Sequence, residues 1–103
     1  MTIRDIQEAA AALCEKHAFP DRSPAQRFRY LITEVGELSR ELVRLEHPQD
    51  DHAEAKHNIG LEIYDIVWNL CDLANQLDID LEKAFAEKAK ANETRVWQNP
   101  NLH

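Results

Sequence analysis

Four acidic residues stand in two matched pairs, and each pair has the spacing of neighbours on one face of a helix. The pairs are Glu34 with Glu37 and Glu62 with Asp65, and both are set among Leu, Ile and Val. Four converging carboxylates would repel one another unless a cation lay between them. Oxygen ligands of this kind suit Mg²⁺ or Mn²⁺. The alternative is an ordinary solvated helix flank that is rich in Glu.

The two pairs belong to a longer repeat. A shift of 28 residues (34 to 62, 37 to 65, 41 to 69) maps the first pair onto the second and Glu41 onto Asn69. At about 100° per residue, both helices then carry these positions on the same flank of their apolar stripe. An antiparallel hairpin would bring the two flanks together. The repeat therefore predicts a metal site, beside which Asn69 either reaches a substrate or is only a polar edge residue.

A cationic face follows near the end of the chain. Lys88, Asn92 and Arg95 lie at positions i, i+4 and i+7, which share one side of a helix. Such a face can hold phosphates or a sugar hydroxyl beside metal ions. The alternative is a solvated face near a helix C-terminus, where cations suit the helix dipole.

Four helical segments must position these groups. Apolar periodicity and capping residues predict helices at 3–17, 24–46, 52–77 and 81–96. Ser23 is a natural N-cap before Pro24, and Asp80 caps the last helix. Residues 96–103 are expected to fray. No strand pattern appears, so the predicted fold class is all-α. Four helices with short connections predict a single domain over residues 1–103, built as a compact four-helix bundle or as a pair of long helical hairpins.

Composition and charge narrow the class of protein. A chain of 103 residues makes one domain, and its formal charge of −7 argues against a nucleic-acid polymer as partner. No window reaches the ~18 apolar residues of a membrane span, and the N-terminus does not read as a signal peptide. A cytoplasmic protein without a membrane partner is therefore expected. Cys14 and Cys71 lack metal-site spacing and are expected to be reduced packing residues.

Taken in order, these motifs resemble those of the MazG-like, all-α nucleoside triphosphate pyrophosphohydrolases. The resemblance rests on E-V-G-E-L at 34–38, E-I-Y-D-I-V at 62–67 and the segment 73–95, and it spans about residues 24–95. It implies hydrolysis of a (deoxy)nucleoside triphosphate to the monophosphate and pyrophosphate, with Mg²⁺ or alternatively Mn²⁺. The implied role is the removal of unwanted nucleotides.

The resemblance also implies a role for each site residue. The metal ligands would be Glu34, Glu37, Glu62 and Asp65. Glu34 would be either a ligand or the catalytic base that activates the attacking water. The substrate contacts would be Lys88, Asn92 and Arg95. The positions that depart from the family's usual pattern are Thr33, Leu61 and Tyr64, and they bear on substrate choice and metal number.

A second apolar stripe on the third helix predicts self-association. Its residues are Leu61, Tyr64, Trp68 and Cys71. A helix that is apolar on two sides is buried on two sides, so a homodimer or homotetramer is expected, as the family resemblance also implies. The alternative is that the first and last helices cover this stripe.

The sequence leaves the substrate open. Residues near the start of the second helix could contact a base, namely Phe19, Arg22, Arg29 and Tyr30. A phosphoribosyl-ATP pyrophosphohydrolase would share the same general chemistry. The alternative from another class is a non-catalytic helical interaction module whose acidic flanks are solvated.

Overall fold

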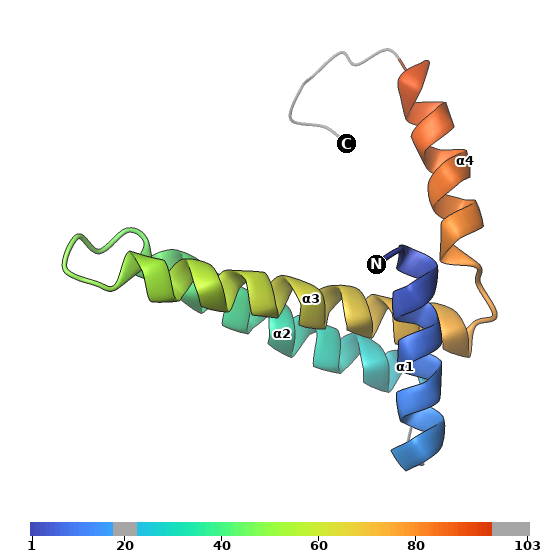
Figure 1. Ribbon diagram of the computed structural model, residues 1–103, viewed down its shortest axis with the longest axis horizontal. Helices are drawn as coiled ribbons and strands as arrows, with labels where there is room; N and C mark the ends of the chain where they lie inside the picture. Colours follow the sequence, from blue (N-terminus) through green and yellow to red (C-terminus); the bar gives the residue numbers. More distant parts are fainter. Residues whose placement is uncertain (18–22, 96–103) are drawn as a thin grey trace.

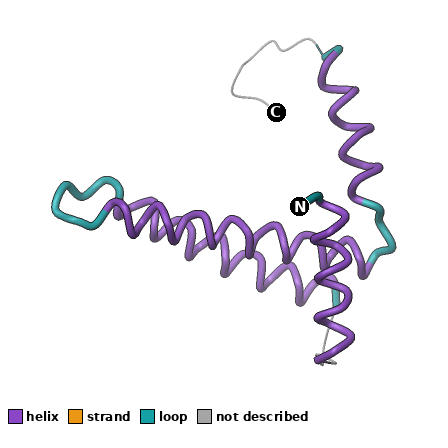
Figure 2. Tube along the Cα trace, in the orientation of Figure 1, coloured by secondary structure: helices purple, strands orange, loops and turns teal. Residues whose placement is uncertain are grey.

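The protein is built of four α-helices joined by short connections (Figures 1 and 2). The computed structural model describes residues 1–17 and 23–95. The helices are α1 (Ile3–His17), α2 (Pro24–Arg44), α3 (His52–Gln76) and α4 (Leu81–Glu93). No strand occurs in these described ranges, which confirms the predicted all-α class. The predicted fraying of 96–103 concerns residues outside the described ranges.

The helix boundaries follow the capping residues that the sequence offers. Ser23 accepts a hydrogen bond from the backbone N–H of Gln26 at the start of α2, and Pro24 occupies the first helical position. Asp51 and Asp80 cap α3 and α4 in the same way. The ends differ by a few residues, since α2 ends at Arg44 and α4 at Glu93, short of the predicted 46 and 96.

The helices α2 and α3 form a long antiparallel hairpin that dominates the molecule (Figure 1). The helix α1 crosses the hairpin near its open end and packs on α3. The helix α4 contacts α1 and projects away from the hairpin (Figure 1). The four helices therefore do not lie side by side in one closed bundle, and the described residues extend 45 × 43 × 26 Å. None of the helices in the described ranges has the length and apolar character that a membrane crossing requires.

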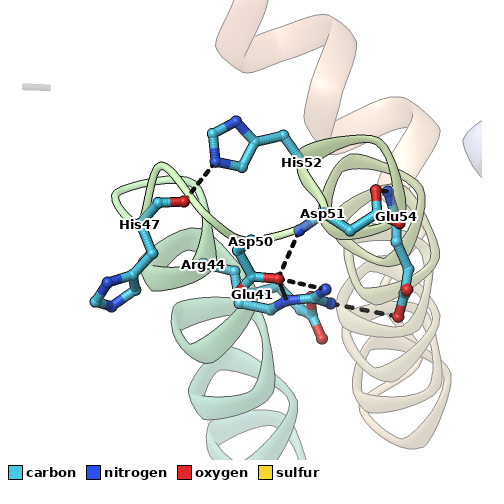
Figure 3. Close-up of polar contacts among 7 residues, drawn as sticks. All are labelled: Glu41, Arg44, His47, Asp50, Asp51, His52 and Glu54. Atoms are coloured by element: carbon cyan, nitrogen blue, oxygen red, sulfur yellow. Dashed lines mark hydrogen bonds and ion pairs between the residues drawn. The ribbon is translucent and has the colours of Figure 1, made fainter.

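An arginine closes the connection between α2 and α3 (Figure 3). Arg44 donates to Oδ1 of Asp50 from Nε at 3.1 Å and from Nη2 at 2.9 Å, and to Oε2 of Glu41 from Nη1 at 3.0 Å. Its Nη1 also lies 3.5 Å from Oε1 of Glu54 in the first turn of α3. Hydrogen bonding to Arg44 holds the pKa of Asp50 below its ordinary value. The closed end of the hairpin is thus fixed by charge-assisted hydrogen bonds.

A buried glutamine attaches α1 to the region between α3 and α4. Gln7 donates from Nε2 to Oδ1 of Asn75 at 3.1 Å and to the carbonyl of Ile79 at 2.9 Å. Its Oε1 accepts from the backbone N–H of Leu81 at 3.0 Å. Asn75 returns a hydrogen bond to the carbonyl of Gln7 at 2.9 Å. These bonds satisfy buried polar groups that would otherwise be costly, so Gln7 ties the first residue of α4 to α1.

The buried core of one copy is small. In the described ranges the buried apolar residues are Ala10, Cys14, Leu31, Ala55, Cys71 and Ala74. Most larger apolar side chains are well exposed, among them Leu61 at 56%, Tyr64 at 40% and Phe85 at 54%. The burial of Cys14 and Cys71 agrees with their predicted packing role. In a single copy, α1 and α4 leave Leu61 and Tyr64 uncovered.

Candidate metal centre

Three of the four predicted acidic ligands come together near the middle of the hairpin, where α2 faces α3. One carboxylate oxygen from each of Glu34, Glu62 and Asp65 lies within 4.8 Å of the other two. Glu34 and Glu62 are half-buried, and Asp65 is exposed. The antiparallel pairing places E-x-x-E of α2 opposite E-x-x-D of α3, as the repeat predicts. We call these three residues the acid cluster.

The fourth predicted ligand, Glu37, is not part of the acid cluster. It is half-buried on α2, one turn beyond Glu34. Its negative charge nevertheless acts on the cluster, because it is among the causes that raise the pKa of Glu34. Glu37 therefore lies near the three oxygens without joining them.

Among the described residues, no cation contributes to the pKa of Glu34 in the acid cluster. Burial raises the pKa of Glu34 from about 4.5 to about 7, with further contributions from a hydrogen bond to Glu62 and from the charges of Glu37, Asp65 and Glu62. When the carboxyls are ionised, Oε2 of Glu34 and Oε2 of Glu62 are buried and accept no hydrogen bond. A divalent cation would satisfy both oxygens and remove the repulsion. The residues present therefore fit Mg²⁺ or Mn²⁺.

The raised pKa of Glu34 predicts an unusual pH dependence of stability in the metal-free protein. Between about pH 4.5 and 7 the folded state retains a proton that the unfolded state releases. The free energy of unfolding should therefore fall as pH rises through this window. Thermal melts in EDTA should show Tm falling with pH in the wild type and falling less steeply in Glu34→Gln. Added Mg²⁺ should raise the wild-type Tm most near pH 7, where Glu34 is most ionised. Equal slopes in both proteins would contradict the prediction.

The side chain of Asn69, a predicted substrate contact, is engaged within the chain. It is 6% exposed. Its Nδ2 donates to the main-chain carbonyl of Asp65 at 2.7 Å, and its Oδ1 accepts from Nη1 of Arg27 at 2.8 Å. Asn69 thus lies beside the acid cluster and ties α3 to α2.

The cationic face lies apart from the acid cluster in a single copy. Lys88 and Asn92 belong to α4, and Arg95 follows its end. Since α4 projects away from the hairpin, the three residues are not brought to the three carboxylates (Figure 1). Of the residues proposed to contact a base, Arg29 and Tyr30 are exposed on α2, one turn or more before Glu34. Phe19 and Arg22 lie outside the described residues.

Sequence reasoning missed the ion pair between Arg27 and Asp72. Nε of Arg27 lies 2.7 Å from Oδ2 of Asp72, whose side chain is completely buried. A signal for it exists, because Arg27 precedes Glu34 by two helical turns and Asp72 follows Asp65 by two. In an antiparallel hairpin these opposite charges face each other.

Comparison with known proteins agrees with this geometry. Residues 22–97 match the family described as the MazG nucleotide pyrophosphohydrolase domain. A curated relative, the dATP/dGTP diphosphohydrolase of Salmonella phage PMBT28, is 30% identical over 97 residues. The alignment covers 94% of this chain and 28% of the relative, so the chain spans less than a third of that protein. No solved structure matches the chain significantly.

Proposed function

The chain belongs to the MazG nucleotide pyrophosphohydrolase domain family, and from this premise we propose that it hydrolyses a (deoxy)nucleoside triphosphate to the monophosphate and pyrophosphate. The observation that carries the proposal is the acid cluster. Three carboxylate oxygens lie within 4.8 Å of one another, and the buried Oε2 atoms of Glu34 and Glu62 accept no hydrogen bond from any described residue outside the cluster. A solvated helix flank has no reason to bury unpaired carboxylates.

The acid cluster would hold Mg²⁺, with Mn²⁺ as an alternative. When bound, the metal would neutralise phosphate charge and lower the pKa of bound water. Glu34, Glu62 and Asp65 would be its ligands. As an alternative to ligating the metal, Glu34 would be the general base that takes the proton of the attacking water. Glu37 would add negative charge beside the ligands and raise the affinity for a cation.

We further propose that the working form is a homo-oligomer. Leu61 and Tyr64 expose apolar surface on α3, next to Glu62 and Asp65 in sequence. A monomer rarely leaves contiguous apolar surface in water. In such an assembly, α4 of one copy would bring Lys88, Asn92 and Arg95 to the acid cluster of another copy. This arrangement would supply the phosphate contacts that the cluster lacks within one chain.

The proposed activity is tested by incubating the protein with a nucleotide panel and Mg²⁺ and measuring pyrophosphate release. The name of the phage relative makes dATP and dGTP the first substrates to compare with the other deoxynucleotides, with ATP and with phosphoribosyl-ATP. Attack at the α-phosphorus in ¹⁸O-labelled water should place the label in the monophosphate and leave pyrophosphate unlabelled. EDTA should abolish the release. If no nucleotide yields pyrophosphate, the chain is better explained as a helical interaction module.

A further inference from the structure

Arg27 lies at the centre of a polar network that joins α1, α2 and α3. Its Nε is 2.7 Å from Oδ2 of Asp72, and its Nη1 donates to Oδ1 of Asn69 at 2.8 Å. Asp72 is 0% exposed, and its other oxygen accepts from Sγ of Cys14 on α1 at 3.3 Å. The Arg27 side chain is itself 11% exposed. One guanidinium thus serves two buried partners on α3.

Two aromatic rings restrict the same guanidinium. Cζ of Arg27 lies 5.4 Å from the ring centroid of Tyr30 and 5.2 Å from that of Trp68. Arginine is planar and rigid, and its nitrogens point in fixed directions. With rings over its face and acceptors at two of its nitrogens, the group has little freedom to reorient.

The network ends at the acid cluster. Asn69, which Arg27 holds, donates from Nδ2 to the main-chain carbonyl of Asp65 at 2.7 Å. On α2, Arg27 precedes Glu34 by two helical turns (34 − 27 = 7 residues). The network therefore lies next to the acid cluster along the hairpin, between the cluster and the open end that α1 crosses. It links the segment that carries Glu34 to the segment that carries Asp65.

We infer that Arg27 is a positioning residue for the acid cluster. It acts through Asn69, which fixes the backbone of α3 at Asp65 against α2 and so sets the separation of the carboxylates of Asp65 and Glu34. This inference rests on the proposed function of the cluster as a metal site. Mg²⁺ demands near-ideal octahedral geometry, so a small displacement of one ligand weakens its binding. Groups that orient ligands typically contribute about 10–100-fold in metal affinity or activity.

The test uses two Arg27 variants and a matched control at the other end of the hairpin. Arg27→Met alone would leave the buried carboxylate of Asp72 unpaired, so the first variant is Arg27→Met with Asp72→Leu, which removes both charges. The second is Arg27→Lys, which keeps a charge for Asp72 but cannot reach Asn69 at the same time. The control is Arg44→Met, since Arg44 also ties α2 to acidic groups on the α3 side. Each protein is assayed for Mn²⁺ affinity by electron paramagnetic resonance, for kcat and KM with the best triphosphate, and for Tm.

Both Arg27 variants should lose about 10–100-fold in Mn²⁺ affinity or in kcat, with a smaller change in KM, while Arg44→Met lowers Tm but keeps both values. If the double variant does not fold, Arg27→Lys decides by the same comparison. Arg27 variants that match Arg44→Met in Mn²⁺ affinity and kcat would overturn the inference but leave the proposed function standing. A wild-type protein that neither binds Mn²⁺ nor releases pyrophosphate would reject the proposed function, and the inference with it.

Discussion

Replacing Glu62 by Gln is expected to lower kcat/KM for pyrophosphate release by about 10³-fold, because it removes one charged ligand from the proposed metal site. Glu62 is half-buried in the acid cluster, and its buried Oε2 accepts no hydrogen bond from any described residue outside the cluster. Glutamine has nearly the same shape, so packing between α2 and α3 should be preserved. Its neutral amide is a weaker ligand for a hard cation than a carboxylate. The measurement is steady-state pyrophosphate release in saturating Mg²⁺, together with calorimetric titration of Mg²⁺ or Mn²⁺.

Two other acids serve as comparisons for Glu62→Gln. Glu54 is exposed in the first turn of α3, far along the hairpin, and Glu54→Gln should retain wild-type activity. Glu37 lies outside the three-oxygen group but acts on it electrostatically, so Glu37→Gln should have an intermediate effect. Wild-type rates in Glu62→Gln, or losses of equal size in Glu54→Gln, would reject the acid cluster as the metal site.

The acid cluster could be predicted from the sequence because it depends on periodicity and on one topological step. The repeat places Glu34 and Glu62 on matching flanks of two helices. A short connection between long helices then favours an antiparallel hairpin, which brings these flanks together. Periodicity shows which face of a helix a residue occupies, but it does not show how far two helices are shifted along their axes relative to each other. The same repeat therefore could not separate Glu37, which stays outside the group, from Asp65, which joins it.

The rest of the site depends on packing that periodicity does not encode. The burial of Asn69 follows from its contact with Arg27, a residue on another helix. The start of α4 is tied to α1 by Gln7, a buried residue within the apolar stripe of α1 whose Oε1 accepts from the backbone N–H of Leu81. The helical spacing of Lys88, Asn92 and Arg95 shows that they share a face, but it does not show which other helix that face contacts. These placements require contacts between residues far apart in the sequence.

Leu61→Arg is expected to convert the proposed oligomer into monomers and to abolish most of its activity. Leu61 is 56% exposed beside the acid cluster, and a charge in the core of an interface would be left desolvated and unpaired. Light scattering should report the change in mass, and the Tm of the variant should lose its dependence on protein concentration. Leu42→Arg is the matched control, since Leu42 is 47% exposed on α2, two turns beyond Glu34. A Leu61→Arg protein that keeps the wild-type mass would place the interface elsewhere.

The loss of activity in the monomer has a specific cause that mixing experiments can isolate. If α4 of one copy serves the acid cluster of another, a Glu62→Gln chain still offers an intact cationic face, and an Arg95→Ala chain still offers intact carboxylates. Each variant alone has only defective sites. A mixed oligomer contains some sites in which the intact cluster of one chain meets the intact α4 of the other. Unfolding and refolding the two variants together should therefore restore part of the wild-type rate, whereas activity that stays at the level of the separate variants would show that each site is built within one chain.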